Sequence, residues 1–232
     1  MFCPSQNTEY DSEDTSDFVI GNDENRRVPV VTKYIYLGFA ISSSLDSECD
    51  VDRRITKANQ IHGSLMVVFR RKDIGLKVKG RIYVVLVLSI LLYGSECWCM
   101  KKVLMDKLRS FYHKCVRDLC GINMYHTQQH HITTTSLLAR LGIHSIEHYY
   151  YSRCLSWGGH VARMSKLEMP RKLLTSWIKD VPRPTGRPFT TWTLSFEDAL
   201  RAKNIDTDFK SWSSLAQNRA EWFKLVKAVT TT

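Results

Sequence analysis

The chain has 232 residues, a formal net charge of +10 and 44% hydrophobic residues, which excludes a wholly disordered chain. The charge is uneven, because residues 1–25 hold seven Asp and Glu and no Lys or Arg, so the remainder carries +17. Such a basic body indicates an anionic partner, most commonly nucleic acid, with a solvated basic surface as the alternative.

The sequence also bears on cellular location. Its N-terminus is polar and acidic, unlike a signal peptide, and seven cysteines are an odd number, so we expect reduced thiols inside the cell. The window 82–100 is the most apolar. Its uninterrupted part is about 12 residues, against the ~20 that a membrane span needs. We therefore expect a buried helix there and no membrane partner.

The N-terminal part is predicted to be an acidic disordered tail, 1–16, followed by a small β-hairpin or meander, 17–43. A short strand at 18–20 precedes a turn cluster at 21–25. A second strand is expected from Val28 to Ile41, because β-branched and aromatic residues alternate along it.

A helical domain is predicted over 44–142. Its first helix starts at Ser47 in an S-x-x-D pattern and carries His62 on its apolar stripe, where a core histidine is expected. The next helix spans 76–98 and is apolar on every side from Ile82 to Tyr93, which predicts burial all round.

The rest of this domain is predicted from glycines that end helices and from a polar loop. A helix over 102–119 ends at Gly121, a polar loop covers 122–132, and a short helix over 133–141 ends at Gly142.

Three further segments complete the chain. A helical extension over 143–178 contains Gly158-Gly159, and this pair predicts a kink or a close approach of another backbone. A Pro-rich linker is expected at 179–190 and two amphipathic helices at 191–229, the second of them broken near Gln217. The fold class is thus mainly α, a helical bundle with a small N-terminal β-hairpin and a C-terminal helical extension.

Catalytic patterns are absent from the sequence. It has no Gly-rich phosphate loop, no G-x-S-x-G and no H-E-x-x-H, so no catalytic residue is assigned. Basic clusters are the stronger signal, since phosphate contacts need only a cationic face. The predicted contacts are Arg70, Arg71, Lys72, Lys77, Lys79, Arg81, Lys107 and Lys114.

A zinc-binding module is an alternative. Cys115, Cys120, His126 and either His130 or His131 have spacings that could close a Cys₂His₂ tetrahedron. The spacings fit known zinc modules poorly, and Cys115 lies on the apolar stripe of its helix, where a cysteine behaves as a small hydrophobe.

Seven short motifs, taken in order over about 17–229, resemble the C-terminal part of a non-LTR (LINE-type) retrotransposon reverse transcriptase. The first four correspond to Y-L-G, R-I-x-x-A, L-L-Y-G-x-E-x-W and C-x-R…G-I. They are Tyr36-Leu37-Gly38 with Ile41-Ser42, Arg54-Ile55 with Ala58, Leu91 to Trp98, and Cys115-Val116-Arg117 with Gly121-Ile122. The last three are Trp157 to Met164, Gly186-Arg187-Pro188 with Trp192, and Asn218 to Trp222, with Asn218 where the family has Asp.

The resemblance implies a primer-grip hairpin at 17–43 and a thumb at 44–142, with Tyr36, Leu37 and Gly38 added to the nucleic-acid contacts. It implies RNA, DNA or an RNA–DNA hybrid as partner, the palm and fingers of a parent polymerase as a second, and a nuclear and cytoplasmic location. The family's aromatic-x-D-D motif, which holds catalytic Mg²⁺, does not occur here. We therefore expect no cofactor and no polymerase activity in this chain. The alternative is a protein-interaction module or a non-functional retroelement remnant.

Overall fold

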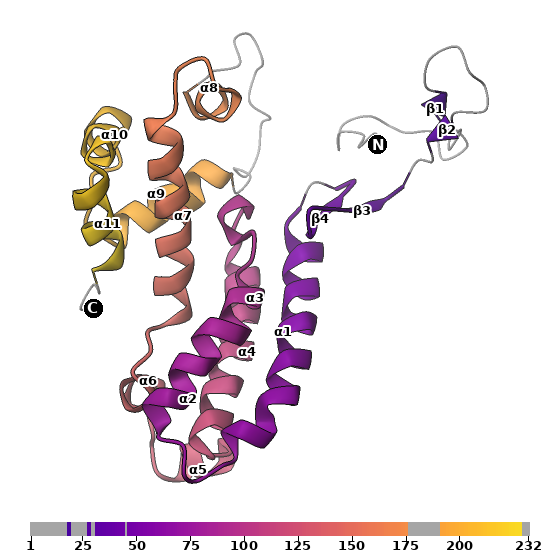
Figure 1. The fold of residues 1–232 in the computed structure, drawn as a ribbon, viewed down its shortest axis with the longest axis vertical. Coiled ribbons are helices and arrows are strands. Elements are labelled where there is room, and N and C mark those ends of the chain that lie inside the picture. Colours follow the sequence, from indigo (N-terminus) through magenta and orange to yellow (C-terminus); the bar gives the residue numbers. More distant parts are fainter. Residues whose placement is uncertain (1–17, 20–26, 29–30, 45, 176–190, 229–232) are drawn as a thin grey trace.

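Helices dominate the fold, so the predicted mainly α class is confirmed (Figure 1). The computed structural model describes residues 18–19, 27–28, 31–44, 46–175 and 191–228. The predicted tail at 1–16 and linker at 179–190 lie outside these residues. The strands are β1 (Phe18–Val19), β2 (Arg27–Val28), β3 (Lys33–Tyr36) and β4 (Phe39–Ser42).

The helices follow in two groups. The first contains α1 (Glu48–Phe69), α2 (Leu76–Tyr83), the π-helical η1 (Val84–Leu88), α3 (Ser89–Leu91), the 3₁₀ turn η2 (Ser95–Cys97), α4 (Lys102–Cys120), α5 (Met124–Gln129) and α6 (Thr134–Leu141). The second contains α7 (Ile146–Arg163), α8 (Met169–Thr175), α9 (Trp192–Arg201), α10 (Phe209–Gln217) and α11 (Arg219–Lys227).

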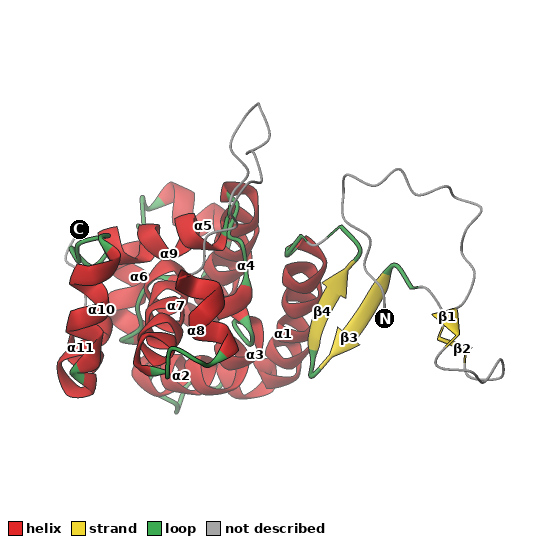
Figure 2. Ribbon diagram, turned by 90° about the horizontal axis from the view of Figure 1, so that it is seen from above, coloured by secondary structure: helices red, strands yellow, loops and turns green. Residues whose placement is uncertain are grey.

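The strands form two separate antiparallel pairs, β1 with β2 and β3 with β4. The single strand predicted from Val28 to Ile41 is wrong, because the chain reverses within it. Leu37 and Gly38 have φ of 47° and 81°, the left-handed pair that closes a two-residue hairpin turn. The Y-L-G motif is therefore the tip of a hairpin, which lies beside α1 and away from the C-terminal helices (Figure 2).

The core of the first group lies between α1, the α2–α3 segment and α4. Periodic apolar residues of α1 and α4 face one another, and the stops that glycine predicts at Gly121 and Gly142 are confirmed, with φ of 67° and 64°. Large fully buried side chains in this core include Phe69, Tyr83, Leu91, Leu92, Trp98, Leu108, Tyr112 and Leu119.

The most apolar helix departs from expectation in two ways. It ends at Leu91, and the chain then turns through Gly94, whose φ is 75°. It is also buried on one side only, since Val85 is 62% and Leu86 44% exposed. Among the described residues, every helix is too short or too polar to meet the requirements of a membrane span.

The polar loop predicted at 122–132 instead contains α5. Asn123 caps this helix by accepting a hydrogen bond from the backbone of His126 at 2.7 Å. A capping Asn satisfies a free N–H at a helix start, and a short helix of polar residues forms without burying any side chain.

The second group of helices is assembled around the glycine pair of α7. A Cβ at Gly158 would clash with the Phe196 ring, and one at Gly159 would clash with the Trp222 indole. The Trp222 Nε1–H also donates to the Leu155 carbonyl at 3.0 Å. The glycines therefore make room for aromatic rings from α9 and α11. The close contact predicted at this pair is made by side chains and not by another backbone.

Candidate nucleic-acid interface

The tip of the β3–β4 hairpin is fixed through its backbone carbonyls. The Gly38 carbonyl accepts from Arg53 Nη1 at 2.6 Å and also from Arg54 Nη2. The Leu37 carbonyl accepts from the Tyr93 hydroxyl at 3.1 Å. Three of the motifs thus meet at one turn, with the Arg54 guanidinium 4.4 Å from the centre of the Tyr93 ring.

Asp50 is the buried centre of these contacts between the hairpin, α1 and the segment from Tyr93 to Trp98, which we call the hairpin joint. Its side chain is fully buried and accepts from the Ala40 amide at 3.0 Å and from Trp98 Nε1 at 2.9 Å. Arg53 and Arg54 lie 3.7 Å from the same carboxylate. A buried carboxylate needs such partners to offset its lost hydration, so Asp50 locks the hairpin to α1 and to Trp98.

The predicted start of α1 is confirmed, although its S-x-x-D pattern does not act as a cap. Ser47 occupies the N-cap position without a side-chain cap bond. Its Oγ instead accepts from the Cys99 backbone N–H at 3.0 Å, while Asp50 turns into the core. Both residues of the S-x-x-D pattern are therefore used in tertiary contacts.

The hairpin presents an apolar strip to solvent. Tyr34 is 46%, Ile35 57%, Tyr36 58% and Leu37 77% exposed. The tip named by the Y-L-G motif is thus rigidly held by its backbone, and its side chains are free to contact a partner.

The basic turn after α1 lies at the other end of that helix. Arg70, Arg71 and Lys72 are all exposed, and Arg71 forms a forked ion pair with Asp73 at 2.6 Å. The side-chain hydrogen bond with Asp73 raises the pKa of Arg71. Arg70 and Lys72 have no carboxylate partner in the described part of the chain.

Two of the predicted nucleic-acid contacts, Lys79 and Lys107, are engaged within the protein. Lys79 is only 7% exposed, so most of its side chain is packed against neighbours and it offers little surface to a partner. Lys107 binds Glu48 at 2.8 Å and Asp52 at 3.0 Å, which ties α4 to α1. Lys77, Arg81 and Lys114 are exposed, as a contact role requires.

The exposed face of α1 extends from the hairpin at one end of the helix to the basic turn at the other. Between Asp52 and Asp73 the sequence has no carboxylate, and the exposed residues between the hairpin joint and the basic turn include Lys57, Gln60, Gly63 and Ser64. Lys57 is not among the contacts predicted from the sequence, because it stands apart from the clusters of cations. The lack of carboxylates between Asp52 and Asp73 is the sequence signal that indicates Lys57 as a contact.

Gly63 is unusual among the helical glycines. A Cβ at Gly80 would clash with the Leu141 carbonyl, and those at Gly158 and Gly159 would meet aromatic rings, whereas a Cβ at Gly63 meets nothing within 4 Å. Glycine in a helix interior costs about 1 kcal/mol relative to alanine. The packing of the described residues gives no reason for that cost.

His62, predicted to be a core histidine, is 3% exposed and its Nε2 lies 3.2 Å from Asp118 Oδ2. Its Nδ1 has no partner in the described structure. Burial lowers the pKa of His62, and the hydrogen bond with Asp118 opposes that shift. The ring packs beside Phe69 and Tyr83, so it belongs to the core and not to the exposed face.

The four zinc candidates do not converge. Within the described ranges, no three His, Cys, Asp or Glu side chains gather as a metal site requires. Cys115 is fully buried, and that burial raises the pKa of its thiol to about 12. His126 lies on α5 and His130 directly follows it, both exposed, with ring centres 4.2 Å apart, while Cys120 is half-buried.

The chain is similar to a protein that is itself connected with transposons. A Caenorhabditis elegans protein, named as an uncharacterized transposon-derived protein, is 27% identical over 204 residues. The match covers 87% of this chain and 72% of that protein. No protein-family model matches the chain. No solved structure matches it significantly.

Proposed function

We propose that this chain is transposon-derived and binds nucleic acid without acting on it. In finer terms, we propose the C-terminal part of a LINE-type reverse transcriptase, in which the hairpin and α1 contact the template–primer duplex. The similarity to a transposon-derived protein supports the origin. The seven ordered motifs support the finer assignment, and the absence of any Asp-Asp pair in the sequence argues against polymerase chemistry.

The observation that carries this proposal is the exposed face of α1. It carries the exposed Lys57 and leads to the exposed Arg70, Arg71 and Lys72, with no carboxylate between Asp52 and Asp73, and it contains the open glycine Gly63. A phosphate backbone is attracted by such a face, and a helix without a side chain at its centre lets a bulky polyanion come close.

The dimensions of this face fit a duplex. Helix α1 has 22 residues, so it is about 33 Å long at ~1.5 Å per residue. One turn of B-DNA spans about 34–36 Å. A B-form duplex lying along α1 could therefore reach Leu37 at the hairpin tip and Arg70 at the basic turn within about one helical turn.

A salt titration tests the proposal. Affinity for an RNA–DNA hybrid is measured by fluorescence anisotropy at several salt concentrations with the full chain. Affinity should fall steeply with salt, since each neutralised phosphate releases counterions. No affinity at low salt, or affinity that salt does not change, would refute binding through cations.

A matched pair of triple variants locates the interface. Replacing Lys57, Arg70 and Lys72 by Gln should lower the salt slope by about three units, roughly one for each phosphate contact. The control changes three exposed lysines elsewhere, namely Lys102, Lys166 and Lys172, by the same charge. Equal losses in the two variants would show that net charge alone governs binding and would remove α1 as the interface.

A second function is favoured by the hairpin. Four consecutive apolar side chains from Tyr34 to Leu37 are exposed, and such a strip is typical of a protein–protein contact. We propose a protein-interaction role as the alternative, with the palm of a parent polymerase or another copy as partner. Gel filtration of nuclease-treated protein tests self-association. A monomer across the micromolar range would exclude a second copy.

A further inference from the structure

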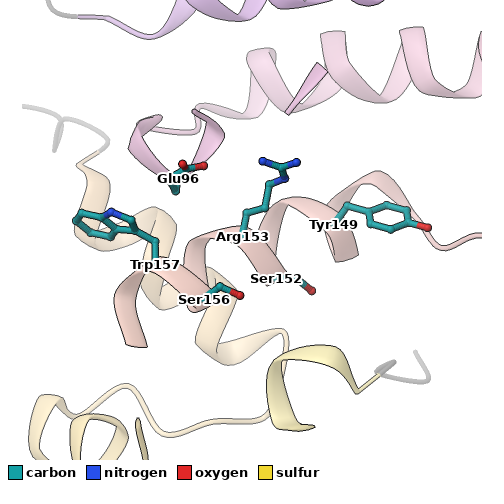
Figure 3. A pocket seen from close by; sticks show the side chains of 6 residues that line it. All are labelled: Glu96, Tyr149, Ser152, Arg153, Ser156 and Trp157. Carbon is teal, nitrogen blue, oxygen red and sulfur yellow. The ribbon is translucent and has the colours of Figure 1, made fainter. Parts of the chain in front are cut away.

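A groove lies on the C-terminal side of the molecule, apart from the exposed face of α1. It has a volume of about 450 Å³ and lies between Glu96 of η2 and one side of α7 (Figure 3). The α7 residues that line it are Tyr149, Ser152, Arg153, Ser156 and Trp157. Two of the ordered motifs meet here, because Glu96 belongs to L-L-Y-G-x-E-x-W and Trp157 begins the motif that ends at Met164.

The walls of the groove are fixed by Trp192. Its Nε1–H donates to the Glu96 backbone carbonyl at 2.7 Å. Its ring packs edge-on against the Trp157 ring, with centroids 5.1 Å apart and planes at 74°. The positions of Glu96 and Trp157 are thus set by a common neighbour that lies outside the groove lining.

Opposite charges border the groove without meeting. The Glu96 carboxylate and the Arg153 guanidinium both project into the space between η2 and α7 (Figure 3). Both residues are half-buried, and neither side chain has an ion pair or hydrogen bond within the described ranges. Neither group has buried polar atoms without a partner, so both are open to solvent and to a ligand. The arrangement is suited to a ligand that supplies donors to Glu96 and a negative charge to Arg153.

We infer that this groove binds one unpaired nucleotide and prefers guanine. The base stacks on the Trp157 indole, Glu96 accepts hydrogen bonds from guanine N1–H and N2–H, and Arg153 binds the phosphate. Bases held on aromatic side chains and bonded on their Watson–Crick edge are the usual form of single-strand recognition.

The preference follows from the carboxylate, which only accepts hydrogen bonds. Guanine has two adjacent donors on its Watson–Crick edge, so both carboxylate oxygens are satisfied in parallel. Adenine and cytosine each place a ring acceptor next to one amino donor, and uracil flanks its single N–H with two carbonyls. With each of these three bases, an acceptor atom of the base would lie next to a Glu96 oxygen, and the two lone pairs would repel one another.

The test uses the full chain and labelled oligouridylates that differ only in one central base. The guanine strand should bind about tenfold more tightly than the adenine strand, as one bidentate base contact provides. Glu96→Gln should abolish this ratio, because an amide offers one donor and one acceptor. Arg153→Gln and Trp157→Ala should weaken all strands while the guanine preference remains.

Equal affinity of the unaltered chain for guanine and adenine strands would overturn the inference, as would a preference that survives Glu96→Gln. Thermal unfolding of each variant identifies losses caused by misfolding. The same variants test the groove and the proposed duplex interface independently. Glu96→Gln should leave the affinity for the RNA–DNA hybrid unchanged. Lys57→Gln combined with Arg70→Gln should leave the ratio of guanine to adenine affinities unchanged. Failure of one site therefore does not imply failure of the other.

Discussion

Replacing Gly63 by alanine should make the protein more stable and its nucleic-acid binding weaker. Gly63 lies within α1, and the added methyl group would meet nothing within 4 Å. Alanine should therefore recover about 1 kcal/mol of helix propensity without a clash. For a chain of this size, that corresponds to a rise in Tm of roughly 2–4 °C.

In the interface that we propose, the same methyl group would stand where the duplex comes closest to the helix. We expect a several-fold loss of affinity for an RNA–DNA hybrid with Gly63→Ala and a larger loss with Gly63→Leu, because leucine is also a good helix former but projects further. Stability and affinity should thus change in opposite directions. A residue needed only for packing would not separate the two readouts.

The assay pairs thermal unfolding with fluorescence anisotropy on the same preparations. Ser110 on the exposed surface of α4 is the control site, and Ser110→Leu should leave hybrid affinity unchanged. If both Gly63 variants bind the hybrid as tightly as the unaltered chain, no ligand approaches the middle of α1. The proposed interface would then be wrong, whatever happens to stability.

Three further predictions concern stability. Gly159→Ala should destabilise the fold by about 1–3 kcal/mol in urea unfolding, because its Cβ would clash with the Trp222 indole; unchanged stability would contradict the close approach. Asp50→Ala should cost about 3–5 kcal/mol by removing the carboxylate beside buried Arg54, and a loss below ~1 kcal/mol would contradict its central role. Burial, with Lys203 and then His144 adding to it, lowers the pKa of His148 from 6.5 to about 4. Stability should therefore fall as pH drops from about 6.5 towards 4, since the unfolded chain binds the proton more readily, and His148→Asn should reduce that fall between pH 6.5 and 5.

Much of the helical framework could be predicted because its signals are local. Apolar spacing marks the helices, and the glycines at 121 and 142 stop two of them where an αL residue is needed. The short turn at Leu37-Gly38 was missed because β-branched residues continue on both sides of it. Only pairing between the two halves shows that the strand is really a hairpin.

The hairpin joint depends on contacts that no local pattern reveals. Asp50 binds the Ala40 amide 10 residues before it and the Trp98 indole 48 residues after it. From sequence alone it was indistinguishable from a solvent-facing helix-start carboxylate. Lys79 differs, because its burial could have been foreseen. It precedes the buried Tyr83 by four residues and so shares its helical face.

The structure separates motif residues that hold the fold from those that remain unexplained. Arg54, Tyr93 and Trp98 fix the hairpin, while the indoles of Trp192 and Trp222 donate to backbone carbonyls of distant segments. Packing and hydrogen bonding account for each of these side chains. Packing and hydrogen bonding do not explain the Glu96 carboxylate. Trp192 binds the backbone carbonyl of Glu96, and any amino acid at this position would offer that carbonyl. Within the described residues, no ion pair or hydrogen bond involves the Glu96 carboxylate or the Arg153 guanidinium, although both residues line the same groove. These two unused charges are the reason for the ligand that we propose there.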